Sequence, residues 1–436
     1  MRRRKYKIIR IIDRVAVGGP TKHVVSLCSR LDETRFTSLL VTGTAAPGET
    51  EILSFVETND VEVEVIPEMS RAVCWKDLLV IGKLYRLFLR ERPDLVHTHK
   101  SKAGATGRIA AFMYKLTPSI LFFTPRKIKT LHTFHGHVLK GYFGKWKTHC
   151  FVVIERLLAR FCTDRVLVVS QQQKNELLNE FKIGRDEQFV VMRLGIELGR
   201  GRMKEPGFRR RHGIDADEFV LASVGRFVPI KNLDLLLRMF ASLTNARPGP
   251  RVRLVLVGDG ELCDCLWRTA QRLGIVDKVV FAGVEQDCLP LYREFDLLAI
   301  TSNNEGTPLA MIEALSQGCA VVSTEVGGVV DLMGSEHSRC GEIKICECGV
   351  MVPPGEVEPL QRAVELLIAD PALRRKTAEA GRAMVRDSYS VQRLVKDMES
   401  LYEDLLGIAP ATHQGTALRN LPRRMPETAG VISVGN

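Results

Sequence analysis

The chain has 436 residues, 45% of them apolar, and its 62 Lys and Arg against 51 Asp and Glu leave a formal charge of +11. This length suggests two domains with full-sized cores, and the composition excludes a disordered, collagen-like or disulfide-stapled chain. No apolar run approaches the ~18 residues of a membrane-spanning helix, and charges interrupt the N-terminal apolar stretch before it reaches the length of a signal peptide. The 11 cysteines follow no repeating frame and mostly lie within apolar runs, which is typical of a reducing cytosol. We therefore expect a cytoplasmic protein.

The basic residues are concentrated in the first half of the chain. Residues 1–200 hold 34 basic and 20 acidic side chains, whereas residues 201–436 hold 28 and 31. Between Asp94 and Glu155 the sequence has ten basic residues and no carboxylate. Summed positive charge attracts nucleic acid, an anionic membrane surface or a phosphate-bearing substrate. A solvated basic face without a specific partner is the alternative.

Short runs of β-branched residues alternate with helical patterns in chain order. The expected strands are 7–12, 37–42, 61–66, 94–99, 130–135, 165–170 and 188–192, followed by 219–224, 251–257, 278–282, 296–301 and 320–324. Amphipathic stretches such as 76–90 and 151–161 separate them. This alternation predicts an α/β fold of two doubly wound, Rossmann-like domains that face a central cleft. Ligands bind such sheets at the carboxyl ends of the strands, so the turns there are the candidate sites.

A segment rich in glycine and arginine divides the two sets of strands. We predict an N-terminal domain over 1–197, a linker over 198–217 and a C-terminal domain over 218–390. Helical periodicity continues to about residue 406. The remaining residues, 407–436, are polar and rich in Pro and Gly, so we expect a disordered tail.

The first candidate site follows the first expected strand. Gly18-Gly19-Pro20 precedes a helical run over 21–31. Paired glycines let backbone N–H groups approach a ligand closely, and a helix N-terminus favours an anion. An ordinary tight turn between a strand and a helix would look the same. No G-x-G-x-x-G motif follows any expected strand, because Cys263 stands where a third glycine would be, so a nicotinamide cofactor is disfavoured.

Imidazoles follow the fifth expected strand, where His135, Gly136 and His137 are consecutive. A histidine here could donate a hydrogen bond to a substrate hydroxyl or phosphate. A structural role and, together with His97 and His99, metal ligation are the alternatives. The lack of nearby carboxylates disfavours a mixed metal site, and imidazoles in so basic a region should resist charging.

Two cations mark the end of the first strand of the second domain. Arg226 follows that strand, and Lys231 lies five residues later, at the expected start of a helix over 232–243. An arginine fork and a lysine point charge beside a helix N-terminus suit a diphosphate leaving group.

Another helix follows the strand at 296–301. We predict Thr307 as its N-cap, Pro308 as its first residue, and Gly318 as the residue just beyond its end. Its N-terminus at Thr307, Pro308 and Leu309 is then a candidate anion site.

Two carboxylates flank this helix N-terminus. Glu305 lies in the loop before it, and Glu313 is expected about two turns into the helix, so that the two carboxylates are of order 10 Å apart. This separation is too wide for the ~5 Å carboxylate pair of a retaining glycosidase. A ribose at Glu313, phosphates at the helix end and a sugar at Glu305 would account for the layout. Glu313 as a paired core charge is the alternative.

Taken together, these motifs resemble those of glycosyltransferase family 4, whose members are retaining enzymes of the GT-B fold. The motifs are Gly18-Gly19, His135-Gly136, Gly225-Arg226 with Lys231, and Glu305-x7-Glu313 followed by Gly327-Gly328. The resemblance runs from about residue 5 to residue 406. The stretches 97–104 and 133–138 further resemble bacterial members that build surface polysaccharides.

The resemblance implies a role for most of these residues. Arg226 and Lys231 would bind the donor diphosphate, Glu313 the donor ribose, and Glu305 the transferred sugar. His135 and the Gly18-Gly19 loop would close over the sugar from the first domain. The resemblance also implies that no cofactor and no catalytic metal take part, because cations and helix N-termini neutralise the leaving diphosphate. In such enzymes the final helix, here 391–406, often crosses back to the first domain.

The predicted function is therefore a retaining glycosyltransferase of hexosyl or N-acetylhexosaminyl type. It would move a sugar from a UDP-sugar to a glycan or lipid-linked glycan acceptor in bacterial cell-surface polysaccharide biosynthesis, with its basic first domain in peripheral contact with the cytoplasmic membrane face. A sugar-nucleotide epimerase or phosphorylase on the same scaffold is one alternative. A non-enzymatic nucleic-acid binder is another, but it leaves the paired acidic residues unexplained, so we expect no nucleic-acid partner.

Two segments depart from the family pattern. One is the arginine-rich link after Leu194-Gly195-Ile196-Glu197, where the family commonly has a short interdomain turn, and the other carries cysteines. Residues 335–349 are polar and carry Cys340, Cys346 and Cys348, where a shorter link is expected. With His337 nearby a zinc site is conceivable, although the spacing is not a familiar one.

Overall fold

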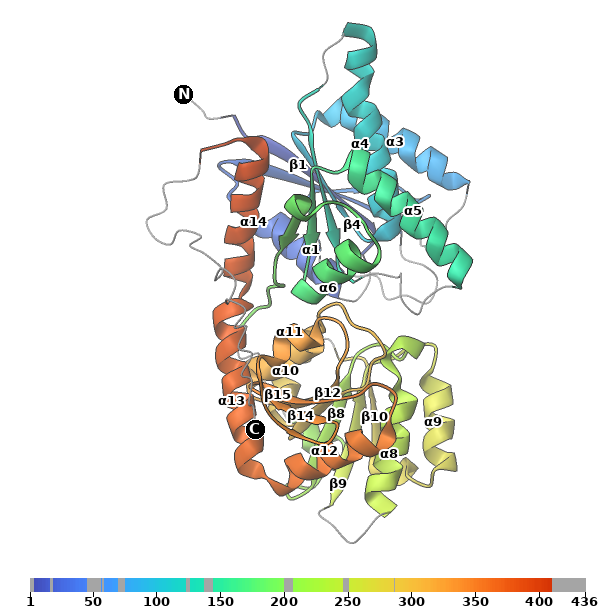
Figure 1. Ribbon diagram of the computed structural model, residues 1–436, viewed down its shortest axis with the longest axis vertical. Coiled ribbons are helices and arrows are strands. Elements are labelled where there is room, and N and C mark those ends of the chain that lie inside the picture. The colour runs from blue at the N-terminus through green and yellow to red at the C-terminus, as the bar shows by residue number, and fades with distance from the viewer. Residues whose placement is uncertain are drawn as a thin grey trace, which may run out of the picture.

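The computed structural model describes residues 4–15, 19–44, 56, 59–69, 75–122, 126–136, 144–199, 207–245, 251–285 and 287–409. These residues form two sheets, and helices cover both faces of each sheet (Figure 1). The predicted α/β fold with two Rossmann-like domains is confirmed.

The first sheet has seven parallel strands in the order β3-β2-β1-β4-β5-β6-β7. They are β1 Tyr6–Arg14, β2 Phe36–Gly43, β3 Val63–Val65, β4 Leu95–His99, β5 Lys129–Phe134, β6 Arg165–Val168 and β7 Phe189–Val191. Successive side chains of a strand point to opposite faces, so Ile9 and Ile11 of β1 pack against one layer of helices and Ile8 against the other. All seven strands expected in this half are present.

Helices of the first domain lie in two layers. They are α1 Gly19–Arg30, α3 Lys76–Glu91, α4 Ser101–Phe122, α5 Lys145–Cys162 and α6 Gln171–Asn175, which a π-helical turn Glu176–Glu180 extends. The layer of α3, α4 and α5 covers one face, and α1 covers the other together with the last helix of the chain.

The second sheet has eight strands in the order β10-β9-β8-β11-β12-β15-β14-β13. They are β8 Phe219–Val224, β9 Val252–Val257, β10 Val279–Gly283, β11 Leu297–Ile300, β12 Ala320–Thr324, β13 Glu336–Cys340, β14 Ile343–Cys346 and β15 Gly349–Val352. Helices α8 Leu233–Asn245, α9 Cys263–Arg272 and α12 Val357–Ala369 pack on one face. Helices α10 Leu309–Gln317 and α11 Val329–Met333 pack on the other.

The polar segment at 335–349 is a β-hairpin and not an irregular insertion. β13 pairs antiparallel with β14, and β14 pairs antiparallel with β15, so the segment extends the sheet at one edge. Every residue of β13 is exposed, which is why its sequence lacks the apolar pattern of a strand. Cys340 is exposed and Cys346 is buried, and no group of three or more His, Cys, Asp or Glu among the described residues is arranged to hold a metal ion. The described residues of this hairpin therefore do not bring its cysteines and His337 together as a set of zinc ligands.

The helical run expected up to residue 406 is two helices, α13 Pro371–Ser388 and α14 Val391–Leu406. In Figure 1, α13 lies along the second domain and α14 along the first. Leu394, Met398 and Tyr402 of α14 are fully buried in a cluster with strand residues of the first sheet. Gly407 ends α14 in a left-handed conformation, and the expected disordered tail lies outside the described residues from 410 onward.

The chain passes between the domains twice, and the two passages lie side by side. The Ile196 N–H donates to the Tyr389 carbonyl at 2.8 Å, and the Val391 N–H donates to the Ile196 carbonyl at 3.0 Å. Gly195 fits closely there, because a Cβ at this position would lie 2.9 Å from the Val391 Cα atom. Within the expected linker, the described residues 207–217 pack on the second domain, where Phe208 is almost fully buried.

Candidate active site

A pocket in the second domain gathers most of the residues that the motifs singled out. It lies at the carboxyl ends of β8 and β11, and its lining includes Arg226, Lys231, Glu305 and Pro308. Arg226 is exposed and Lys231 is half-buried. Parallel strands bring their carboxyl ends to one edge of a sheet, so residues about 75 positions apart in sequence meet there.

Lys231 and Glu305 contact each other directly. The Lys231 ammonium donates to Glu305 Oε1 at 2.5 Å, and the Ser302 hydroxyl donates to the same oxygen at 2.6 Å. Lys231 ends a 3₁₀ turn, Pro229–Lys231, and α8 begins only at Leu233 because Asn232 is left-handed (φ 48°). The Lys231 ammonium is therefore already paired with Glu305, and an anion that binds Lys231 must displace that carboxylate.

The start of α10 differs from the prediction. Pro308 has an extended backbone (ψ 114°) and is the N-cap, and the helix begins at Leu309 rather than at Pro308. Thr307 is not the cap, since its hydroxyl donates instead to the Val169 carbonyl of the first domain at 3.4 Å. Glu313 lies four residues after Leu309, which is about one turn into the helix and not two. Gly318 ends the helix in a left-handed conformation (φ 78°), as predicted.

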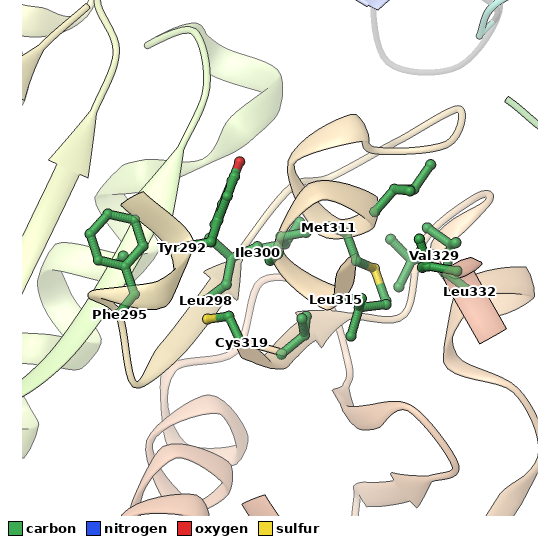
Figure 2. Close-up of a cluster of buried hydrophobic side chains, with 14 of the residues drawn as sticks. Tyr292, Phe295, Leu298, Ile300, Met311, Leu315, Cys319, Val329 and Leu332 are labelled. Atoms are coloured by element: carbon green, nitrogen blue, oxygen red, sulfur yellow. The ribbon is translucent and has the colours of Figure 1, made fainter. Parts of the chain in front are cut away.

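Glu313 projects from the side of α10 that faces away from the core. Met311 and Leu315 of this helix pack into a buried cluster with Leu298 of β11, and Figure 2 shows the hydroxyl of Tyr292 at the margin of the same cluster. That hydroxyl donates to Glu313 Oε2 at 3.1 Å. Burial raises the pKa of Tyr292 well above its usual value, and the neighbouring carboxylate raises it further, so the hydroxyl keeps its proton.

The second contact of Glu313 comes from the other domain. Lys22 of α1 places its ammonium 3.6 Å from Glu313 Oε1, and its side chain is about half exposed. Glu313 is thus a carboxylate at the boundary between the domains, with partners in both, and not a charge enclosed in one core.

The two domains touch at the motif loops. A Cβ at Gly306 would lie 2.6 Å from the carbonyl oxygen of His135 and 3.1 Å from the Cα atom of Gly136. A Cβ at Gly19 would lie 2.7 Å from Leu309 Cδ1, at the first turn of α10. The His135-Gly136 turn and Gly19 therefore lie against the loop and the helix that carry Glu305 and Glu313, while Gly18 lies outside the described residues.

Behind this contact, half-buried His135 packs against a group of buried histidines. Its Nε2 atom lies 3.0 Å from His99 Nδ1, and its ring meets the ring of His23 edge-on at 5.0 Å. His97 lies 4.1 Å from His99, ring centre to ring centre. His99 Nε2 and both ring nitrogens of His23 are buried without a hydrogen-bond partner.

Burial keeps these imidazoles neutral. Desolvation is the largest cause that lowers the pKa of His135 well below 6.5, and the neighbouring His23 and Lys100 lower it further. The pKa of His23 falls to about 3, again chiefly through burial. The predicted resistance to charging is confirmed, but its main cause is loss of water rather than the basic surroundings. A neutral His135 can either donate or accept a hydrogen bond at the domain boundary.

Three contact residues escaped the sequence analysis, namely Lys22, His23 and Tyr292. Lys22 and His23 follow the glycine motif closely, as the fourth and fifth residues of α1. A lysine near a helix N-terminus is unfavourable, because the helix dipole is positive there. This unfavourable placement is a sequence signal for a negatively charged partner across the cleft. Tyr292 offered no such signal, because its hydroxyl acts through a tertiary contact with α10.

Known proteins match both halves of the chain. The family model described as Glycosyltransferase Family 4 matches residues 17–200, and the one described as Glycosyl transferases group 1 matches residues 205–384. Among the described residues, no helix has the length and apolar character needed to cross a membrane.

Two similar curated proteins cover most of the chain. A capsular polysaccharide biosynthesis glycosyltransferase of Staphylococcus aureus, CapM, is 24% identical over 78% of this chain and 85% of its own length. The UDP-Gal:alpha-D-GlcNAc-diphosphoundecaprenol alpha-1,3-galactosyltransferase of Escherichia coli is 24% identical over 80% and 85%.

Solved structures share the fold. HepE of Anabaena in complex with UDP and glucose has a TM-score of 0.72 at 20% identity, over 92% of this chain and 100% of that one. WaaG, a glycosyltransferase involved in lipopolysaccharide biosynthesis, has a TM-score of 0.66 at 15% identity, over 90% and 99%. With both halves matched by family models and the two-domain fold in common, the chain belongs to the family 4 glycosyltransferases and has the GT-B fold.

Proposed function

We propose that this glycosyltransferase transfers a hexosyl or N-acetylhexosaminyl group from a UDP-sugar, with retention of configuration, to a glycan or lipid-linked glycan of the bacterial cell surface. The observation that carries the proposal is the convergence of Arg226, Lys231 and Glu305 beside the first turn of α10, closed from the other domain by His135 and Gly136. A diphosphate, a ribose and a sugar would each find a complementary group there.

The donor diphosphate would lie between Arg226, Lys231 and the α10 N-terminus at Thr307, Pro308 and Leu309. Arginine offers a planar fork, lysine a mobile point charge, and the helix end unpaired N–H groups. These groups would stabilise the negative charge that develops as the bond between the sugar and the diphosphate breaks, without a catalytic metal or cofactor. Lys231 would exchange its contact with Glu305 for a phosphate oxygen.

The sugar would then be held by the groups that this exchange frees. Glu305, released by Lys231, would accept hydrogen bonds from sugar hydroxyls, and neutral His135 would donate one from the opposite side. The Gly18-Gly19 loop would cover the sugar from the first domain. Glu313 would accept from the ribose hydroxyls. The acceptor hydroxyl would attack on the face that the diphosphate leaves. The new glycosidic bond would form as the bond to the diphosphate breaks, and the hydroxyl proton would pass to the departing diphosphate oxygen.

The names of similar proteins support the donor class and the setting. The E. coli relative is named for UDP-Gal and a diphosphoundecaprenol acceptor, the S. aureus relative for capsular polysaccharide, and HepE was solved with UDP. We place the enzyme in the cytoplasm, where nucleotide sugars are made, with its basic first domain toward the membrane. Neither a nucleic-acid partner nor a resident cofactor is part of the proposal.

The decisive experiment combines donor binding with donor hydrolysis. The protein is incubated with UDP-, GDP- and ADP-sugars in EDTA, and release of the nucleoside diphosphate is followed for wild type, Lys231→Ala and Glu313→Ala. Lys376→Ala, at an exposed position of α13, is the matched control. We expect UDP release in EDTA from one or more UDP-sugars, lost in both site variants and kept in the control.

The other outcomes separate the alternatives. An epimerase would convert the donor sugar without releasing UDP, and a phosphorylase would release it only with inorganic phosphate present. Binding of no nucleotide sugar at any concentration would overturn the proposed donor site.

A further inference from the structure

Helix α5 of the first domain presents an unusual outer face. Five large apolar side chains are exposed on it: Trp146, Val153, Ile154, Leu157 and Phe161. Trp146 is 86% exposed, Phe161 58% and Leu157 53%. Val153 and Ile154 lie seven and eight residues after Trp146, Leu157 lies three after Ile154, and Phe161 lies four after Leu157. Since 3.6 residues complete a turn, these spacings place all five side chains on one stripe of the helix.

The opposite face of α5 fixes this orientation. Glu155, the only carboxylate of the helix, is buried and accepts from Arg108 of α4 at 2.9 and 2.7 Å. Val152, Leu158 and Ala159 are buried beside it. The apolar stripe therefore cannot turn inward without breaking a buried ion pair and uncovering this core.

A row of basic side chains borders the stripe. Lys145, His149, Arg156 and Arg160 are exposed at spacings of four, seven and four, which align them along one side, and Lys147 lies on the other. α5 itself has no exposed carboxylate, and Glu180 of the following π-helical turn lies beside Lys145, His149 and Arg156. An apolar stripe flanked by Lys and Arg is the pattern of a helix that lies in the plane of a membrane surface.

The stripe begins at the edge of the first domain that meets the second domain. α5 follows β5, and a helix that connects parallel strands starts at the carboxyl edge of the sheet, where His135 and Gly136 meet the second domain. Trp75, 71% exposed, precedes α3 at the same edge. Tryptophan is enriched where protein meets the membrane interface.

We propose that the outer face of α5 docks on an anionic phospholipid bilayer, with Trp146, Ile154, Leu157 and Phe161 inserted among the lipids and Lys145, Lys147 and Arg160 against the headgroups. A second copy of the chain is a poorer fit, because a twofold contact through this face would bring its cations against one another. Nucleic acid would leave the apolar stripe unused. The proposal concerns binding alone and holds whatever sugar or acceptor the active site uses.

The test is flotation of the full chain with vesicles that contain no acceptor. Vesicles of phosphatidylcholine alone are compared with vesicles that also contain phosphatidylglycerol, at low and high salt. We expect binding to the anionic vesicles that high salt weakens. I154S/L157S should weaken it roughly tenfold or more, and K145Q/R160Q should weaken it by a similar factor on anionic vesicles only.

Matched controls come from the second domain. Trp267→Ser removes an exposed apolar side chain of α9, and R375Q/K376Q removes two exposed cations of α13, so both should bind like wild type. Unchanged thermal unfolding of all variants excludes misfolding as the cause. Equal flotation with neutral and anionic vesicles, or none, would overturn the proposal. So would a concentration-dependent dimer that I154S/L157S dissociates while flotation is unaffected.

Discussion

Glu313 is held from two directions by groups of different kinds. Tyr292 donates a hydrogen bond from within the second domain, and Lys22 approaches from the first. The tyrosine contact is partly buried, whereas the lysine is half exposed and its attraction is screened by solvent. The orientation of the carboxylate therefore depends mainly on Tyr292.

Tyr292→Phe tests this dependence, because it removes the hydroxyl and keeps the buried ring. A hydrogen bond to a charged group contributes roughly 1.5–3 kcal/mol, and we expect UDP affinity to fall roughly tenfold as Glu313 loses its orientation toward the ribose. Isothermal titration with UDP measures the change. Inorganic pyrophosphate, which has no ribose, is the control ligand and should bind both proteins equally. Equal UDP affinity in the two proteins would contradict the role given to Tyr292.

The buried histidines predict an acid-sensitive first domain. Burial lowers the pKa in His23, His97, His99, His132 and His135, so each stays neutral in the folded state while it gains a proton below about pH 6.5 when unfolded. The unfolded state then binds more protons, and stability falls as the pH falls. Each buried histidine lowers the free energy of unfolding by up to about 1.4 kcal/mol per pH unit below pH 6.5.

Urea unfolding between pH 7.5 and pH 5.5 measures this loss, since most carboxylates remain ionised across that window. We expect the midpoint to drop steeply below about pH 6.5 and to change little above it. A midpoint that stays level down to pH 5.5 would show that the histidines are solvated and can take up protons in the folded protein.

At the scale of elements, the loop before α10 works as a contact surface between the domains. Gly306 meets the backbone of the His135-Gly136 turn, which cannot move aside as a flexible side chain could. The absence of a side chain at Gly306 is therefore what allows the two domains to approach.

Gly306→Ala should hold the cleft open. A methyl group 2.6 Å from the His135 carbonyl oxygen must separate the domains, because a Cβ does not approach a backbone atom this closely. We expect UDP binding in the second domain to persist and sugar transfer or donor hydrolysis to fall by at least about tenfold, since a displaced catalytic group loses its alignment. Gly82→Ala in α3, where a Cβ would meet nothing within 4 Å, is the control. Full activity of Gly306→Ala would mean that the loops do not meet during the reaction.

Helices and strands could be predicted where the residues that define them are close together in the sequence. The strands from β1 to β12 were found from the sequence because most of them are buried and read as short β-branched runs. β13, β14 and β15 were missed. β13 is an edge strand with all its residues exposed, and β14 and β15 have only four residues each. The start of α10 was placed too early because Thr307 and Pro308 have the right types for a cap and a first turn, but Thr307 donates across the domain boundary instead.

The candidate site divides in the same way. Arg226, Lys231 and Glu305 were predictable because each follows a strand of one sheet, and parallel topology alone brings such residues together. The contacts of Glu313 with Lys22 and Tyr292 depend on how two domains and two helices pack, which no local pattern in a single sequence encodes.

For the whole molecule, α14 makes the last part of the chain a component of the first domain. The Tyr402 hydroxyl lies 2.7 Å from His97 Nδ1 and accepts from Arg10 at 3.1 Å, beneath the histidine group. Met398 and Leu394 fill the apolar cluster on the same face of the sheet. The first domain is therefore incomplete until residues beyond 390 have been added.

Met398→Ala should consequently destabilise the first domain rather than the second. The side chain is fully buried, and truncating such a residue costs about 2–5 kcal/mol of unfolding free energy. Urea unfolding measures the loss, with Lys396→Ala at an exposed position of the same helix as the control. UDP binding, which uses the second domain, should survive at urea concentrations that already unfold the first. Wild-type stability of Met398→Ala would show that α14 rests only loosely on the sheet.

The paired passages at Ile196 and Tyr389–Val391 have a consequence for motion. Because two backbone hydrogen bonds tie them together, we expect them to bend as a single pivot about which the domains rotate. Such a rotation would open the cleft least next to the pivot and most at the margin that is farthest from it. Each catalytic cycle would then bring the same few loops into contact in the same register, because rotation about one pivot repeats the same path of closure.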